Sequence, residues 1–165
     1  MKITRVSTRR QFNFAAELFL EYMDELSADP GTKHLPVQKI EKDISHLATD
    51  FAPPKGVVWL AIQAGEVAGC VGMKTFRNRK CEMKRLYVRK RFRRAHIGKM
   101  LALACIQNAR TNGYELVRLA TTPSMTSAIS LYESLGFKKG PPWRKRNTDG
   151  YVFMTLTLDR KVRPT

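Results

Sequence analysis

The 165-residue chain lacks the features that would place it in a membrane or outside the cell. Its longest apolar runs are too short to cross a bilayer, and no apolar segment with a cleavage site follows the amino terminus. Its three cysteines and three histidines lack the paired spacing of a disulfide framework or a zinc site. These residues are Cys70, Cys81, Cys105, His34, His46 and His96. We therefore expect a cytoplasmic protein with buried thiols, no metal ion and no membrane contact.

Acidic residues are also scarce. The chain has 14 Asp and Glu against 30 Lys and Arg, which gives a formal net charge of +16. The basic residues concentrate in residues 84–99 and 138–146. Either cluster has the charge to bind the phosphates of a nucleic acid or of a nucleotide cofactor. Charge alone does not separate a basic nucleic-acid- or ribosome-binding module from an enzyme.

Length and hydrophobic patterning predict one α/β domain. A content of 43% hydrophobic residues supports a packed core, and we expect a single domain over residues 1–160 with a short basic tail at 161–165. Thr8 and Gln11 have the spacing of a capping box ahead of a helical pattern. The predicted helices cover residues 12–26, 37–47, 97–112 and a last one that starts at Ser124 or Thr126 and ends at Leu135. The predicted strands cover residues 3–6, 57–62, 67–73, 82–88, 116–120 and 151–158. This order predicts a mixed sheet.

The most informative segment joins the strand at 82–88 to the helix that starts near residue 97. A basic turn, residues 89–96, lies between them. Backbone N–H groups are free at the start of a helix, and the helix dipole and fixed cations add attraction for anions. The sequence therefore predicts a site for the pyrophosphate of a phosphorylated cofactor.

In this turn, Arg93-x-x-His96-x-Gly98 resembles the Q/R-x-x-G-x-G/A acyl-CoA signature of the GNAT acetyltransferase superfamily. Three more segments are similar to family elements in the same order: residues 57–73 to its second and third strands, 82–88 to its fourth strand, and 128–137 to its A-x-x-L-Y-x-x-x-G-F element. The resemblance spans nearly the whole chain. It implies a single mixed, mostly antiparallel sheet of about six to seven strands, flanked by about four helices.

The resemblance also implies acetyl-CoA as the co-substrate. The pyrophosphate would be bound by backbone N–H groups at the helix start, with charge from Arg93 and Lys99, and a main-chain N–H of residues 86–88 would meet the reacting carbonyl oxygen. The implied cofactor-binding residues are Leu86, Tyr87, Val88, Arg93, Arg94, Ala95, His96, Ile97, Gly98 and Lys99. His96 stands where the family has glycine, and Met125 where many members have asparagine. A non-catalytic acyl-CoA sensor on the same fold therefore stays open.

Acetyl transfer to an amine requires a base for the ammonium proton and benefits from an acid for the departing thiolate. Glu82 is the candidate base, because it lies on the strand that would carry the acetyl group. Its alternative role is to offset the charge of Lys84 or Arg85. Tyr132 matches the acid that is usual in the family, and its alternative role is a core residue with its hydroxyl at the rim.

The acceptor is left open by the sequence. In the family the first two helices wall the acceptor site, so Glu21, Tyr22 or Glu25 could hold a cationic amine, unless this acidic face is only solvated. The segment 143–146 could recognise an acidic substrate or RNA, or form a solvated loop. A small amine, an amino acid, an aminoglycoside-like compound and a protein amine all remain candidates. We expect direct transfer in a ternary complex, by a monomer or a homodimer.

Overall fold

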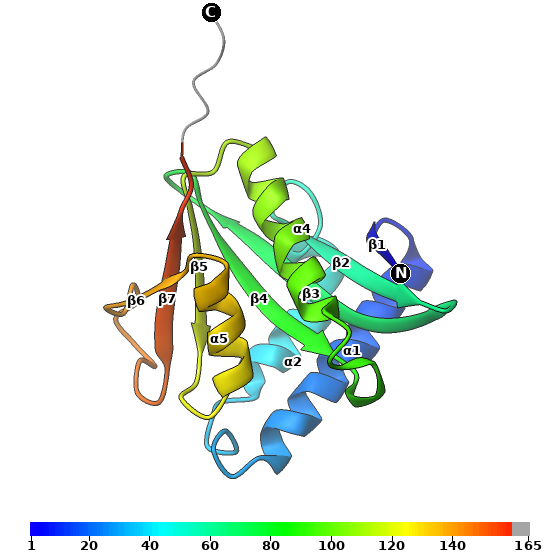
Figure 1. The fold of residues 1–165 in the computed structure, drawn as a ribbon, viewed down its shortest axis with the longest axis horizontal. Coiled ribbons are helices and arrows are strands. Elements are labelled where there is room, and N and C mark those ends of the chain that lie inside the picture. Colours follow the sequence, from blue (N-terminus) through cyan, green and yellow to red (C-terminus); the bar gives the residue numbers. More distant parts are fainter. Residues whose placement is uncertain (160–165) are drawn as a thin grey trace, which may run out of the picture.

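The computed structural model describes residues 1–159, and within them seven strands form one sheet in the order β1-β2-β3-β4-β5-β7-β6 (Figure 1). The strands are β1 Lys2–Arg5, β2 Gly56–Gln63, β3 Glu66–Phe76, β4 Lys80–Val88, β5 Leu116–Thr121, β6 Lys138–Gly140 and β7 Val152–Thr157. Neighbouring strands are antiparallel except β4 and β5, which are parallel. The predicted mixed, mostly antiparallel sheet is confirmed, and the predicted tail at 161–165 lies outside the described residues.

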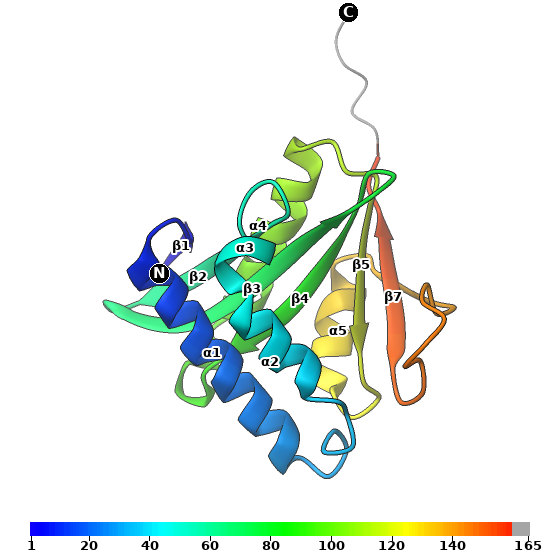
Figure 2. The same ribbon diagram turned by 180° about the vertical axis from the view of Figure 1, so that it is seen from behind.

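The helices cover both faces of the sheet. They are α1 Arg9–Ala28, α2 Gln38–Ser45, α3 Leu47–Asp50, α4 Ile97–Thr111 and α5 Thr126–Ser134. Helices α4 and α5 lie on the face seen in Figure 1, and α1 and α2 cross the opposite face, seen in Figure 2. None of the helices in residues 1–159 is both long enough and apolar enough to span a membrane.

Two hydrophobic cores result, one on each face of the sheet. In β2, Val57 and Trp59 belong to the core under α4, and Val58 and Leu60 belong to the core under α1. Because successive side chains of a strand point to opposite faces, a strand covered on both sides is apolar throughout. The three cysteines are buried within these cores as free thiols, as expected.

Local signals explain most helix ends. Thr8 and Gln11 form the predicted capping box. The helices α4 and α5 are each followed by a glycine with positive φ, 73° at Gly113 and 94° at Gly136, a conformation that side chains disfavour. The predicted side-chain cap at Ser124 or Thr126 is wrong, because the N-cap residue is Met125 and the hydroxyl of Ser124 lies 3.1 Å from that of Thr122.

Two elements differ from the sequence prediction. The second helix is interrupted at His46, where α2 ends and the single turn α3 begins. The short strand β6 follows α5 directly and pairs with β7. Its three residues, Lys-Lys-Gly, carry no apolar alternation, so tertiary pairing rather than local pattern makes this strand.

The feature that positions the site is the divergence of β4 from β5. The two strands are paired only at Lys80–Glu82 and Leu116–Arg118. Further along, β4 has a bulge in which Arg85 and Leu86 stand opposite the single residue Val71, and Arg85 has a φ of 58°. The bulge bends β4 away from β5, so the sheet opens between them.

Candidate active site

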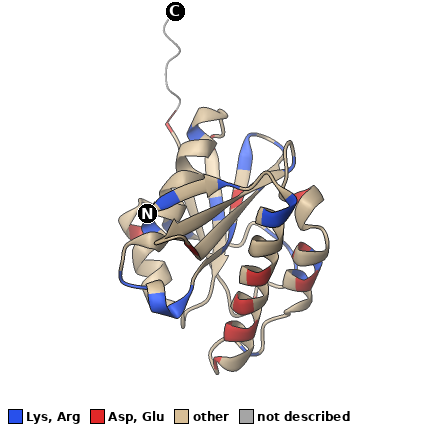
Figure 3. Ribbon diagram, turned by 90° about the vertical axis from the view of Figure 1, so that its right-hand side faces the viewer, with Lys and Arg blue, Asp and Glu red and all other residues tan. Residues whose placement is uncertain are grey.

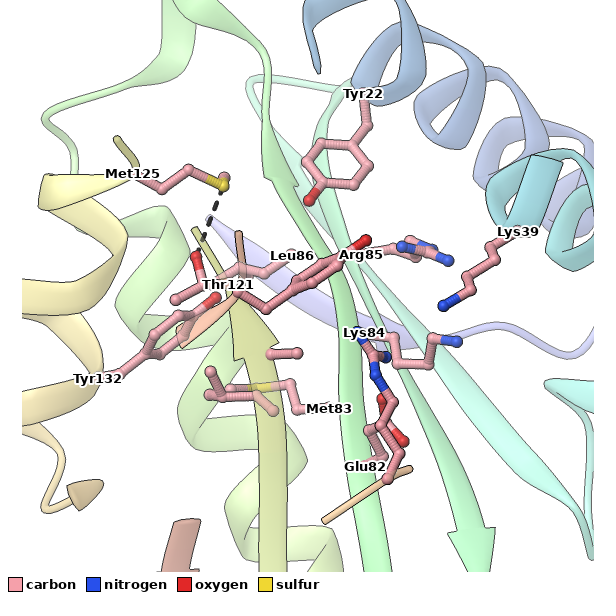
Figure 4. A pocket seen from close by; sticks show the side chains of 14 residues that line it. Tyr22, Lys39, Glu82, Met83, Lys84, Arg85, Leu86, Thr121, Met125 and Tyr132 are labelled. Carbon is pink, nitrogen blue, oxygen red and sulfur yellow. Dashed lines mark hydrogen bonds between the residues drawn. The ribbon is translucent and has the colours of Figure 1, made fainter. Parts of the chain in front are cut away.

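A pocket lies where β4 and β5 diverge, and it is walled by α1, α2, α5 and the segment before β7 (Figure 4). Its lining residues are Tyr22, Lys39, Glu82, Met83, Lys84, Arg85, Leu86, Leu119, Ala120, Thr121, Met125, Tyr132, Arg144 and Tyr151. Four residues singled out from the sequence, Glu82, Leu86, Tyr132 and Tyr22, therefore meet in one place. They come from three separate elements of the chain.

Tyr132 enters the pocket from α5 and is only 7% exposed. Its ring packs against Phe137, with ring centroids 5.8 Å apart, and its hydroxyl is directed into the pocket (Figure 4). Burial, with smaller effects of Tyr22 and Cys105, raises the pKa of Tyr132 well above its ordinary value. The phenol therefore keeps its proton at neutral pH and can act as a hydrogen-bond donor or an acid.

Glu82 lines the pocket at the end where β4 and β5 are still paired, and it is the last residue of β4 that pairs with β5. Its carboxylate Oε2 is 3.5 Å from Nε of Arg118, which stacks over the Phe76 ring at 4.1 Å. The alternative expected for Glu82 was a charge partner role toward Lys84 or Arg85. The charge of Glu82 acts against the lowering of the Lys84 pKa by burial, and the carboxylate also pairs with a β5 arginine that the sequence reasoning missed.

Lys84 and Arg85 are held by one buried carboxylate, Asp43 of α2. Its oxygens lie 2.7 Å from Nζ of Lys74, 3.3 Å from Nζ of Lys84 and 2.8 Å from Nη2 of Arg85. Burial alone would raise the pKa of Asp43, but Arg85, Lys84 and Lys74 outweigh burial and lower it. The sequence contained a signal that Asp43 is buried. It follows Ile40 by three positions and precedes Leu47 by four, which places it on the apolar face of the helical pattern.

Lys39 and Arg144 have no carboxylate within 4 Å among residues 1–159. Nε of Arg144 donates to the carbonyl of Asn147 at 3.0 Å, and its guanidinium stacks over the Tyr151 ring at 4.5 Å. Its buried Nη2 has no hydrogen-bond partner within the described chain. Burial lowers the pKa of Lys39, and the charges of Arg144 and Arg85 lower it further. Sequence reasoning did not connect these two cations, which lie far apart along the chain.

The start of α4 offers free backbone donors. Arg94 and His96 have φ values of 67° and 57°, and no side chain caps the helix. The first backbone bond of the helix runs from N–H of Met100 to the carbonyl of His96 at 3.1 Å. His96 thus adopts the left-handed conformation that glycine accepts most easily, and histidine is among the residue types that tolerate it.

Gly98 faces the gap between α5 and β4. A Cβ on this residue would lie 3.6 Å from Cδ2 of Leu131 and 3.9 Å from Cγ2 of Val88, which is ordinary contact. A larger side chain would extend further between Leu131 and Val88. The described residues contain no carboxylate within 4 Å of the charged groups of Lys90, Arg94 or Lys99. These residues fit a phosphorylated, extended ligand that runs from the helix start to the pocket.

Two other arginines of the basic turn face α1 instead. Nη2 of Arg89 is 2.7 Å from Oε1 of Glu21, and Nη2 of Arg93 is 2.8 Å from Oε2 of Glu25. Figure 3 shows the acidic residues repeated along α1. Glu21 and Glu25 are thus in ion pairs and do not line the pocket, whereas Tyr22 does. Arg93 also donates from Nε to the carbonyl of Val88 at 2.8 Å.

The three residues expected to meet the cofactor on β4 alternate between the two faces of the sheet, with Leu86 and Val88 on the α4 side and Tyr87 on the α1 side. Leu86 lines the pocket, and Val88 packs on the α4 side. Tyr87 points to the α1 side, where its ring lies 6.0 Å from that of Tyr22. Within the described residues, β4 has no paired residue on its β5 side beyond Glu82, so backbone groups there are available to a ligand.

Comparison with known proteins agrees with this arrangement. Residues 16–137 match the model of the Acetyltransferase (GNAT) family. An uncharacterized N-acetyltransferase of Schizosaccharomyces pombe is 31% identical over 145 residues, covering 87% of this chain and 86% of that protein. The chain therefore belongs to the GNAT family of acetyltransferases, as its motifs predicted.

Other known proteins match a smaller part of the chain or share only its fold. N-acetylaspartate synthetase of Mus musculus is 34% identical over 113 residues, which are 67% of this chain and 36% of that protein. The PaiA N-acetyltransferase of Thermoplasma acidophilum, solved in complex with coenzyme A, superposes with a TM-score of 0.71 at 17% identity. That match covers 96% of this chain and 100% of the other, and it supports the fold assignment.

Proposed function

We propose that this enzyme transfers an acetyl group from acetyl-CoA to a primary amine, by direct attack within a ternary complex. The observation that carries the proposal is the opening between β4 and β5. The pocket that contains Tyr132 and Glu82 lies at this opening, and the start of α4 has no side-chain cap. Family membership supports acetyl transfer, and the coenzyme A complex of a structural neighbour supports this type of co-substrate.

The cofactor would be held mainly by the backbone. The N–H groups of residues 94–99 would bind its pyrophosphate, with Lys90, Arg94 and Lys99 adding charge. Arg93 would contribute through its main chain, because its guanidinium is paired with Glu25. When bound, acetyl-CoA supplies the acetyl group as a thioester, whose C–S bond breaks as the C–N bond to the amine forms.

The chain's own residues would manage charge and protons during that exchange. Glu82 would accept the ammonium proton, directly or through water, so that the amine attacks as a free base. A main-chain N–H of residues 86–88 would donate to the carbonyl oxygen as negative charge develops on it. Tyr132 would give its proton to the departing sulfur and recover one from solvent.

The first test is cofactor binding. Acetyl-CoA is expected to raise the melting temperature, because it binds only the folded state. Gly98→Leu should abolish this rise, since the side chain fills the gap toward Leu131, whereas Gln107→Leu, at an exposed site of the same helix, should leave it intact. Absence of binding at millimolar acetyl-CoA would refute the proposal.

The second test is turnover. Release of the CoA thiol is followed with a panel of primary amines, and mass spectrometry identifies the acetylated product. Transfer to at least one amine supports the enzyme. Tight acetyl-CoA binding without transfer to any amine would instead indicate the acyl-CoA sensor.

A further inference from the structure

Cations dominate the acceptor side of the pocket. Lys39 comes from α2, Lys84 and Arg85 from the bulged part of β4, and Arg144 from the segment before β7. Figure 4 shows Lys39, Lys84 and Arg85 gathered on one side of the pocket, away from Tyr132. The pocket lining contains a single carboxylate among the described residues, Glu82, and this group is paired with Arg118.

Two of these cations have no ion-pair partner among residues 1–159. Asp43 binds Lys84 and Arg85, but no carboxylate of residues 1–159 lies within 4 Å of Lys39 or Arg144. Arg144 is also oriented by its stacking on Tyr151 and by its bond to Asn147, which leaves a buried terminal nitrogen without an acceptor. A buried donor without a partner is uncommon, and a carboxylate oxygen is the acceptor that a guanidinium binds most strongly.

The cations are separate from the phosphate-binding turn. Lys39 lies on α2, and Lys84 and Arg85 contact Asp43 of the same helix, which covers the face opposite to α4. The start of α4 has its own unpaired cations. The charge around Lys39 and Arg144 is therefore left for the second substrate rather than for the phosphates of the first.

A purely cationic acceptor suits this pocket poorly, because an ammonium ion would enter among positive charges at close range. An amine that carries its own anionic group avoids this cost. Burial, and then the charges of Arg144 and Arg85, lower the pKa of Lys39, and the same surroundings would favour the free-base form of a bound amine.

We infer that the acceptor is a small amine bearing a carboxylate, as an amino acid does, and that Lys39 and Arg144 bind this carboxylate while the amine points to the opening between β4 and β5. This inference rests on the proposed function and specifies its substrate class. Lys39 and Arg144 are then specificity-determining residues.

The first arm of the test compares matched acceptors. L-Amino acids, including aspartate and glutamate, are assayed beside their α-amides and beside putrescine and O-phosphoethanolamine at saturating acetyl-CoA. We expect kcat/KM for the best amino acid to exceed that of its amide about 10- to 100-fold, which corresponds to a hydrogen bond between charged groups. A preference for the amide, for putrescine or for the phosphate ester would overturn the inference.

The second arm uses substitutions of the two cations. Lys39→Met and Arg144→Gln should raise KM for the amino acid about tenfold and change KM for its amide little. Lys42→Met, exposed on the same helix, and Arg146→Gln, exposed in the same segment, remove equal charge and should leave both KM values unchanged. Equal losses for acid and amide, or a weaker affinity for CoA measured by calorimetry, would contradict carboxylate binding.

Different results would contradict the proposed function and the inference about the acceptor. Transfer to neutral or cationic amines alone overturns the carboxylate inference and keeps the acetyltransferase. Bound acetyl-CoA with no transfer to any amine overturns the proposed function and the inference together.

Discussion

Basic residues meet carboxylates in two regions of this molecule, with different stoichiometry. At the end of β4, Arg89 pairs with Glu21 and lies 4.0 Å from Glu17, and Arg93 pairs with Glu25, all three carboxylates being on α1. Near the pocket, Asp43 lies within 4 Å of three cations, of which only Lys74 has a second carboxylate nearby among residues 1–159, Asp50 at 3.7 Å. Lys39 and Arg144 have no carboxylate within 4 Å in residues 1–159. The net charge of +16 does not distinguish the two regions. What distinguishes them is which cations have a carboxylate nearby, and the cations without one are those that can bind an anionic ligand.

Solvent exposure separates the two regions as well. The side chains of Arg93 and Glu25 are 39% and 34% exposed, whereas that of Asp43 is 4% exposed. Water and salt screen an exposed pair, so it contributes little to folding. A buried carboxylate among cations contributes much more, because removing it leaves buried charges unpaired.

The largest effect is expected for Asp43→Asn. Losing the carboxylate leaves Lys84 and Arg85 without an ion-pair partner among residues 1–159 and leaves Lys74 with only Asp50, at 3.7 Å. The free energy of unfolding at pH 7 should therefore fall by about 3–5 kcal/mol. Urea unfolding measures this fall. Asp24→Asn, at an exposed position of α1, is the matched control and should change stability by less than about 0.5 kcal/mol.

The pH dependence of the same variant follows from the sign of the pKa shift. Because folding lowers the pKa of Asp43, its stabilisation is present above the unfolded pKa, about 3.9, and is lost as pH falls through the lower folded value. The difference between wild type and Asp43→Asn should be constant from pH 7 to about pH 5 and shrink below about pH 4. A difference that stays the same at pH 3 would contradict the role of the carboxylate charge.

Tyr132→Phe should lower kcat about 10- to 1000-fold, because the departing sulfur loses its proton donor, while the affinity for CoA barely changes. Tyr114→Phe, outside the pocket, is the control. The measurement is single-turnover transfer, so that chemistry limits the rate. An unchanged rate would assign Tyr132 to the core alone.

Glu82→Gln should reduce kcat/KM by about 10- to 100-fold at low pH, where free amine is scarce, and much less at high pH, where the amine is already neutral. A pH–rate profile of both proteins measures the difference. A loss of equal size at every pH would show that Glu82 positions Arg118 or the strand instead of accepting a proton.

The smallest effect is expected for Glu25→Gln, which breaks the exposed pair with Arg93. Its cost should be no more than about 1 kcal/mol and should decrease further at 1 M salt. Urea unfolding at two salt concentrations measures it. A loss as large as that of Asp43→Asn would remove the distinction between the two regions.

Elements with local signals were predictable from the sequence. The capping box at Thr8, the glycines that follow α4 and α5, and the apolar runs of β2 and β3 depend on neighbours only a few positions away. The strand β6 was not predictable, since it depends on pairing with β7, and the break at His46 had no glycine or proline to mark it in the sequence.

The residues of the candidate site also divide into those that the sequence predicted and those that it did not. Tyr132, Glu82 and the turn before α4 were found because each lies in a motif of contiguous residues. Lys84 and Arg85 were assigned to the same basic cluster as that turn, but the bulge of β4 aims them at Asp43 on the other face of the sheet. A bulge of one residue reverses the alternation of side chains, which charge counting does not reveal.

The sequence by itself determined the family and the order of most helices and strands, and it predicted the residues that would hold a phosphorylated co-substrate, because these depend on short-range spacing. Only the tertiary structure decided which cations are neutralised and which are free. Residues 39, 85 and 144 belong to elements far apart along the chain, and they meet because β4 bends away from β5 under α2. Electrostatic compensation depends on distance in space, and the folded chain alone sets that distance.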